Sequence, residues 1–336
     1  MHTRGLPEKI RASLGSAVVL GLTKAALDAE PTTIYLLTFL SSKCSANCGF
    51  CPQARKSRGR ADMLSRVTWP VFPTERVVSR IQHAVKKGAV ERVCIQALNY
   101  PTVFEDVENI VREVLSRVNV PISISCQPMN REEIRKLAEV GVERICVPLD
   151  ATTEELFNKV KGRLAGGPYV WEEQRRSLKE AVHIFGKGSV STHLIVGLGE
   201  TEEEAVRAIQ WCVDLGVYPG LFAFTPIRGT TLETRARPSI SHYRTIQIAH
   251  SLITDRRTRC EEMYFSKEGA IKDFGIPIKH LEQTVRTGKP FLTSGCPGCN
   301  RPYYNERPGG PIYNYPRHPQ SEEIAEIKEQ ISALDA

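Results

Sequence analysis

The sequence lacks any apolar run long enough to cross a membrane. No stretch of its 336 residues approaches the ~18 consecutive apolar residues that a bilayer span requires. Near the N-terminus, "GSAVVLGLTKAAL" (15–27) is short and is not followed by a small-x-small cleavage site. Its lysine and strong helix formers favour an amphipathic helix over a signal peptide. We therefore expect a cytoplasmic protein without a membrane partner.

The sequence also lacks internal repeats, low-complexity segments and the signatures of nucleic-acid-binding proteins. The net charge is +7, but the lysine and arginine residues are spread along the chain. Such a charge is equally typical of a mildly basic solvated surface and of a docking surface for an acidic partner. We expect no nucleic-acid partner.

Cysteine, in contrast, is plentiful. Ten cysteines in a chain expected in the cytoplasm indicate metal or redox chemistry rather than a disulfide framework. Three of them fall in "CSANCGFC" (44–51), spaced C-x3-C-x2-C, with no fourth nearby. A structural zinc site would need a fourth ligand close by. Three thiolates on an iron–sulfur cubane instead leave one iron open to a substrate.

Short β-branched runs alternate with amphipathic helical patterns along most of the chain. Eight strands are predicted, at 32–40, 91–98, 121–127, 143–149, 189–198, 220–226, 261–267 and 290–295. Helices are predicted between them, and those at 74–88, 131–141 and 202–216 end at glycine. This alternation predicts an α/β fold, a closed (β/α)8 TIM-type barrel. The cysteine loop then lies on the carboxyl rim, where barrel enzymes carry their chemistry.

This pattern divides the chain into three parts. A helical segment (1–31) precedes the barrel (32–295), and a Gly/Pro/Tyr-rich extension (296–336) follows it. The extension carries a C-x2-C pair, Cys296 and Cys299, and ends in the helical pattern "SEEIAEIKEQISALDA".

The cysteine loop after the first strand, with Phe50 before its last cysteine, resembles that of the radical S-adenosylmethionine (SAM) superfamily. The segment "CGFCPQARKSRG" narrows the resemblance to the biotin synthase branch. This resemblance implies that Cys44, Cys48 and Cys51 hold a [4Fe–4S] cluster. Its open iron would bind SAM, which is cleaved reductively to a 5′-deoxyadenosyl radical. No catalytic side chain can be named with certainty, because cluster-bound SAM is itself the radical source.

A second cluster is also implied by the resemblance. Biotin synthases carry auxiliary-cluster cysteines at the positions of Cys94 and Cys126, but Ser191 stands where a third would lie. The expected arginine ligand is missing from "EEMYFSKEG" as well. The predicted ligands of an auxiliary [4Fe–4S] cluster are therefore Cys94, Cys126, Cys296 and Cys299, with Cys146 in reserve. The alternative is that Cys94 and Cys126 are buried structural thiols. Cys212 is expected in the core, and Cys260 is expected to be either structural or exposed.

The family also implies SAM contacts, by position. Asp150 resembles the acid that binds the ribose diol, and Gly197 and Glu200 fall in the "IVGLGE" segment that packs the adenine. Thr225 and Pro226 fit a sixth-strand contact. Arg175, or its neighbour Arg176, is a candidate partner for the methionyl carboxylate, and a solvated helix arginine is the alternative. His193 either contacts substrate or is a core histidine.

The C-terminal segment "TSGCPGCNRPYYNERPGGPIYNYP" resembles one component of the two-protein lipoyl synthases of archaea and some bacteria. This likeness implies sulfur insertion into an octanoyl or mercapto-octanoyl chain on a lipoyl carrier protein. It also implies a partner synthase component and an electron donor such as a ferredoxin. Three alternatives stay open: a biotin-synthase-type enzyme acting on a free small molecule, a radical SAM enzyme without sulfur transfer, and a non-catalytic iron–sulfur electron carrier.

Overall fold

A curved, mostly parallel sheet forms the centre of the molecule. The computed structural model describes residues 5–127 and 129–331. The eight strands of the sheet follow the order β10-β9-β8-β7-β6-β2-β1-β5. Six of them are parallel and confirm the first six predicted strands: β2 (Thr33–Thr38), β6 (Arg92–Gln96), β7 (Ile122–Ser125), β8 (Arg144–Cys146), β9 (Val190–Val196) and β10 (Val217–Ala223).

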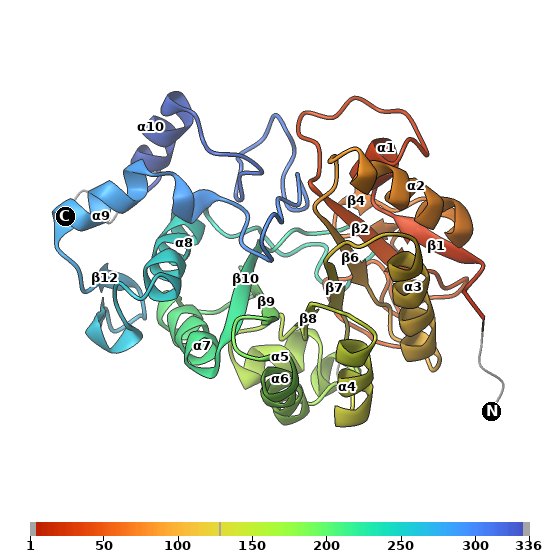
Figure 1. Ribbon diagram of the computed structural model, residues 1–336. Coiled ribbons are helices and arrows are strands. Elements are labelled where there is room, and N and C mark those ends of the chain that lie inside the picture. The colour runs from red at the N-terminus through yellow and green to blue at the C-terminus, as the bar shows by residue number, and fades with distance from the viewer. Residues whose placement is uncertain (1–4, 128, 332–336) are drawn as a thin grey trace.

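Helices line the outer face of this sheet (Figure 1). They are α2 (Thr74–Lys86), α3 (Val103–Arg117), α4 (Arg131–Glu139), α5 (Glu154–Val160), α6 (Trp171–Phe185), α7 (Glu202–Leu215) and α8 (Ile240–Thr254). Helix α7 shows how the sequence sets their ends, because Thr201 and Glu204 form a capping box and Gly216 ends the helix in a left-handed conformation. In the described part of the chain, no helix is long and apolar enough to span a membrane.

The prediction of a closed eight-stranded barrel is wrong for the described residues. The expected seventh strand forms only β11 (Tyr264–Phe265), which pairs with β12 (Ile271–Asp273) away from the main sheet. The expected eighth is a 3-10 turn, η3 (Lys289–Phe291), followed by one bridge between Leu292 and Tyr315. At the other edge of the sheet, strand β1 (Lys9–Ala12) pairs antiparallel with residues 36–38 of β2, where a closing strand would pair.

The N-terminal segment is only partly helical. Its helix α1 (Leu14–Val19) covers just the first part of the amphipathic helix expected over 15–27. Strand β1 precedes α1 and links the sheet to the edge strand β5 (Val71–Pro73). This segment is therefore built into the central sheet.

The C-terminal segment spans the opening left between β10 and β2 (Figure 1). On one side, the backbone amide of Leu221 in β10 donates to Ser294 Oγ at 2.7 Å. On the other, the Thr32 hydroxyl at the start of β2 donates to the carbonyl of Gly298. Helix α9 (Ile278–Arg286) precedes this crossing, and α10 (Ser321–Glu329) follows it as predicted. The end of the predicted terminal helix, 332–336, lies outside the described residues.

Candidate functional site

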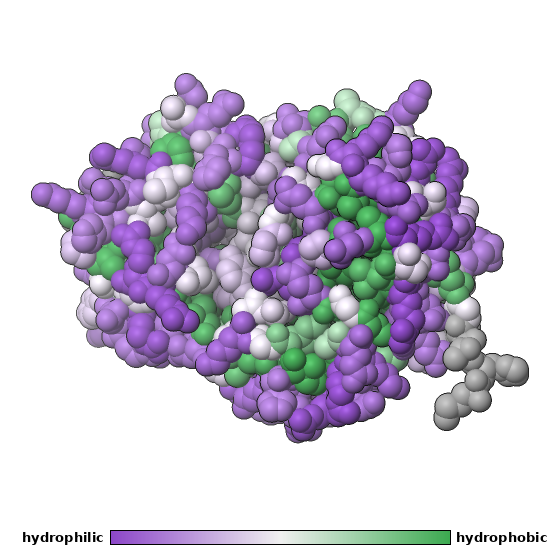
Figure 2. Space-filling view, viewed as in Figure 1, coloured by the Kyte–Doolittle hydropathy of each residue, from purple (hydrophilic) through white to green (hydrophobic). Residues whose placement is uncertain are grey.

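The concave face of the sheet surrounds a cavity of about 240 Å³. Alternate residues of a strand point to the same side. Residues whose side chains point to the concave side line the cavity, among them Tyr35, Cys94, Cys146, His193 and Phe222. In the space-filling view, the surface is hollowed between the two ends of the sheet, and polar residues surround the hollow (Figure 2).

The three-cysteine loop enters this cavity from the carboxyl end of β2. Cys44, Cys48 and Cys51 all line it. Backbone bonds fix the loop: the amide of Cys44 donates to the carbonyl of Gln53 at 2.9 Å, and that of Gly49 donates to the carbonyl of Val160 at 2.7 Å. The sequence-based placement of this loop on the carboxyl rim is thus reproduced.

The sulfurs of the loop differ in their surroundings. Cys44 Sγ accepts hydrogen bonds from the amides of Asn99 at 3.1 Å and Ala46 at 3.4 Å. Burial raises the pKa of Cys48 well above its usual value and that of Cys51 to about 12. Cluster binding must therefore displace protons from these two thiols.

A second set of thiols lies at the other end of the strands. The turn that carries Cys296 and Cys299 is held at the amino ends of β2 and β6, where Arg92 Nε donates to the carbonyl of Pro297 at 3.3 Å. Both cysteines line the cavity, as does Cys94 on β6. The hydroxyl of Tyr35 lies 3.3 Å from Cys299 Sγ. The cavity therefore has cysteines from one segment at its rim and from another at its floor.

Cys126 lies away from the cavity that its predicted role as a cluster ligand requires, whereas Cys146 lies at it. Cys126 belongs to the hydrophobic core between sheet and helices, with its sulfur 3.8 Å from that of Met129, and it does not line the cavity. Cys146, the reserve ligand, does line it. Cys212 is buried in the same hydrophobic core as Cys126, as expected. Cys260 is buried there too, which agrees with the structural alternative and not with the exposed one.

Across the described residues, no three His, Cys, Asp or Glu side chains are gathered tightly enough to hold a single metal ion. A [4Fe–4S] cluster is larger, and its Cys ligands surround the cluster rather than one atom. The cysteines that line this cavity fit that arrangement, because they face a common open volume from separate segments.

Two of the predicted SAM contacts reach the cavity. Asp150 lines it, in a left-handed backbone conformation with φ at 65°, and its carboxylate pairs with Lys161 Nζ at 2.7 Å. Thr225 also lines it, with its hydroxyl donating to the carbonyl of Asn305 at 3.0 Å, and Pro226 follows directly. These residues stay candidates for SAM binding.

Other predicted SAM contacts have structural partners instead. Glu200 accepts hydrogen bonds from the amides of Gly197 at 2.5 Å and Leu198 at 3.0 Å, so its carboxylate braces its own loop. Arg175 pairs with Glu172 and lies 4.7 Å above the ring of Trp211 on the outer helices. Arg176 is exposed. Neither arginine reaches the cavity, so the prediction of a carboxylate partner on α6 receives no support.

Two buried cations were missed from the sequence. Lys161 is fully buried, and besides Asp150 it donates to the carbonyl of Pro148. Arg301 lines the cavity, with its guanidinium 3.8 Å from the centre of the Phe222 ring and its Nε without a partner. In the sequence, Lys161 follows Asp150 and Arg301 follows the C-x2-C pair. No known spacing rule predicts a cation at either position. Only the folded chain brings them to the site.

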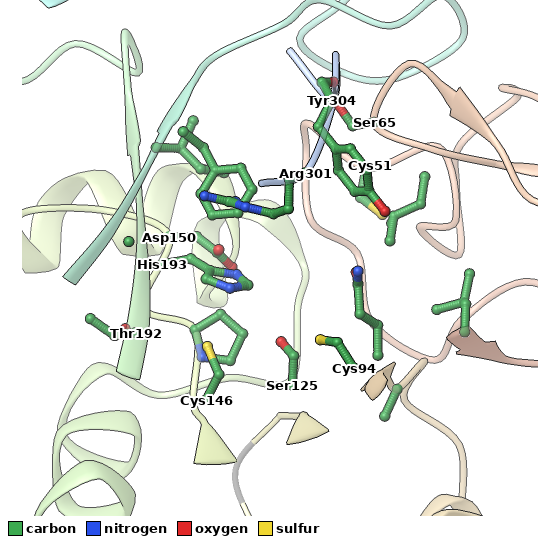
Figure 3. Close-up of a pocket in the computed structure, with 18 of the residues that line it drawn as sticks. Cys51, Ser65, Cys94, Ser125, Cys146, Asp150, Thr192, His193, Arg301 and Tyr304 are labelled. Atoms are coloured by element: carbon green, nitrogen blue, oxygen red, sulfur yellow. Dashed lines mark hydrogen bonds between the residues drawn. The ribbon is translucent and has the colours of Figure 1, made fainter. Parts of the chain in front are cut away.

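His193 is a cavity residue rather than a residue of the outer core. Its ring centre lies 4.6 Å from that of Phe222, and burial lowers its pKa to about 4. The imidazole is therefore neutral at physiological pH. Figure 3 shows it between Asp150 and Cys146, so the substrate-contact alternative stays open.

Lys161→Met is expected to destabilise the protein strongly. It leaves the Asp150 carboxylate buried without its cation, and breaking a buried pair costs roughly 3 to 5 kcal/mol. The midpoint of thermal unfolding should fall by several degrees. Lys159→Met is the matched control on the same helix, because the Lys159–Glu155 pair is exposed and should barely matter. Equal melting of the two variants would contradict this view of Asp150.

A model of the radical SAM superfamily matches residues 38–212, which is just over half of the chain. The match includes the three-cysteine loop and runs from β2 into α7. The chain belongs to the radical SAM superfamily.

Among characterised relatives, the chain is similar to biotin synthases. It is 28% identical to that of Persephonella marina over 202 residues, which are 59% of this chain and 56% of the relative. It is 25% identical to that of Synechococcus elongatus, covering 81% of this chain and 83% of the relative. The chain spans about half the length of the first relatives it matches.

Solved structures agree on the fold. A crystal structure of methylornithine synthase superposes with a TM-score of 0.53 at 14% identity, covering 72% of this chain and 76% of that one. A hydrogenase maturase from Carboxydothermus hydrogenoformans gives 0.53 at 15% identity, covering 90% and 67%.

Proposed function

We propose that this chain is a sulfur-inserting radical SAM enzyme, one component of a two-protein lipoyl synthase. Its substrate is an octanoyl or mercapto-octanoyl chain attached to a lipoyl carrier protein. One observation carries the proposal: a single cavity is lined by Cys44, Cys48 and Cys51 at its rim and by further cysteines at its floor. A substrate between them can meet both a radical source and a sulfur source.

Residues at the rim, at the floor and along the walls of the cavity would have different roles. A rim cluster with SAM would supply one-electron chemistry, and a floor cluster would supply sulfide. Asp150 and Thr225 are available near the rim for SAM. Side chains such as Leu37, Ile195 and Phe222 line the walls and keep water from the reacting carbon. Such exclusion matters because a carbon radical reacts with whatever is nearest.

The surface beside the rim supports a carrier-bound substrate. Arg55, Lys56 and Arg58 follow the cluster loop directly and are all exposed. Together with the net charge of +7, they suit an acidic carrier domain that presents its acylated lysine to the cavity. A free small molecule would need no such surface.

A biotin-synthase-type reaction on a free acid is the second candidate. It is favoured by the similarity to biotin synthases and by Arg301, a buried cation whose unpartnered Nε lines the cavity. That guanidinium could pair with a substrate carboxylate, a group that an amide-linked acyl chain does not have.

The test combines metal analysis with a choice of substrates. Anaerobically purified protein should contain about eight irons per chain. With SAM and reductant, it should thiolate an octanoylated lipoyl-domain peptide and leave free octanoic acid unchanged, as followed by mass spectrometry. About four irons would remove the sulfur-donor argument. Thiolation of the free acid alone would favour the second candidate.

A further inference from the structure

We infer that the fourth ligand of the auxiliary cluster is Cys146, and that Cys126 is not a ligand. The site then consists of Cys94 on β6, Cys146 on β8, and Cys296 and Cys299 on the C-terminal turn. The inference rests on the proposed function, because it names the cluster ligands at the floor of the same cavity.

Strand register carries the first step. In the parallel sheet, Cys94 pairs with Ser123, and Ser125 pairs with Cys146. All four residues line the cavity. Cys126 comes one residue after Ser125 and therefore points to the opposite face. A one-residue slip of β7 could bring it in, but the slip would also turn the fully buried Ile122 and Ile124 out of the core.

The neighbours of the thiols give the second step. Cys296, Cys299 and Cys146 lie near Cys94, and Cys296 lies near Cys146. The neighbours of Cys126 are Cys146 and Glu133. Cys94 and Cys146 therefore share Cys296 as a neighbour, whereas Cys126 has one cysteine neighbour and lies in the core behind the sheet. Figure 3 shows the sulfurs of Cys94 and Cys146 on either side of Ser125, both facing the cavity.

Hydroxyl groups around these sulfurs give the third step. Ser123 Oγ lies 3.4 Å from Cys296 Sγ, and the Tyr35 hydroxyl lies 3.3 Å from Cys299 Sγ. Ser125 and Ser191 are the register partners of Cys146 on the two neighbouring strands. Hydrogen bonds to the sulfurs tune iron–sulfur clusters and orient their ligands. Cys126 has only the thioether of Met129 within such a distance.

Ser191 lies beside the assigned ligand. It is the direct register partner of Cys146 on β8, and both residues line the cavity.

The test compares two buried cysteines on neighbouring strands. Cys146→Ala should lose the auxiliary cluster and fall to about four irons per chain, while 5′-deoxyadenosine formation continues. Cys126→Ala should keep about eight irons and the electron paramagnetic resonance signals of both clusters. The two thiols are comparably buried, at 6% and 3% exposed, so the cavities created are similar. The opposite pattern would overturn the assignment.

Separate controls test whether the variants fold and whether the proposed function holds. Retention of the rim cluster shows that a variant is folded. Cys146→Ser, which preserves the size of the side chain, should lose the same irons as Cys146→Ala. Full iron content in both Cys146 variants would contradict this assignment while leaving sulfur insertion intact. A parent protein with only about four irons would contradict the proposed function itself.

Discussion

Cys48→Ala is expected to abolish reductive cleavage of SAM. Two thiolates cannot replace three in holding a cubane with one open iron, so the rim cluster is lost. The barrel should remain folded, because Cys48 sits on the loop after β2 rather than within a strand. The measurement is 5′-deoxyadenosine formed anaerobically with reductant, and the expected drop is to the background of protein without iron.

Cys212→Ala provides the matched control. Cys212 is also buried, but it lies in α7 among core residues and not at the cavity. That variant should melt at a lower temperature and still cleave SAM. If Cys48→Ala protein formed 5′-deoxyadenosine at the parent rate, the role of the loop as the cluster site would be wrong.

The double variant Cys296→Ala/Cys299→Ala is expected to separate SAM cleavage from sulfur transfer. It removes two floor thiols and leaves the rim loop unchanged. Formation of 5′-deoxyadenosine should persist, and thiolation of the octanoylated peptide should stop because no sulfide lies within reach of the carbon radical. Both products can be followed by mass spectrometry in one reaction.

Each other outcome of that experiment has a definite meaning. Thiolated peptide at the parent level would show that the C-x2-C turn is structural. Loss of both products, with a lower melting temperature, would show that the turn is needed to hold the open side of the sheet. A double replacement of Thr32 and Asn300 by alanine tests this second reading, since these side chains anchor the same turn without contributing a thiol.

The rim of the site could be predicted from the sequence because residues close together in the sequence define it. Cys44, Cys48 and Cys51 are fixed by spacing alone, and the preceding run of buried residues reads clearly as a strand. The same holds for the six parallel strands, whose apolar character reflects burial on both faces. The six parallel strands and the position of the cysteine loop after β2 are therefore confirmed.

Features that depend on register or distant pairing could not be predicted in this way. "ISISCQ" reads as a strand, but its end decides whether Cys126 or Ser125 faces the cavity, and one residue reverses the answer. The open sheet could not be predicted either, because β1 pairs with β2 and β11 pairs with β12, contacts that the strand patterns at 261–267 and 290–295 do not reveal. Lys161 and Arg301 reach the site only through tertiary contacts.

The crossing of the C-terminal segment has a consequence for how the protein is made. Thr32 and Gly298 are 266 residues apart in sequence, and Asn300 contacts the backbone of Glu30 across 270 residues. On the ribosome, the N-terminal strands emerge and can pair long before Cys296 and Cys299 are translated. The residues of the rim loop are therefore synthesised long before those of the floor. The proposed auxiliary cluster at the floor could be completed only after synthesis of the chain is nearly finished.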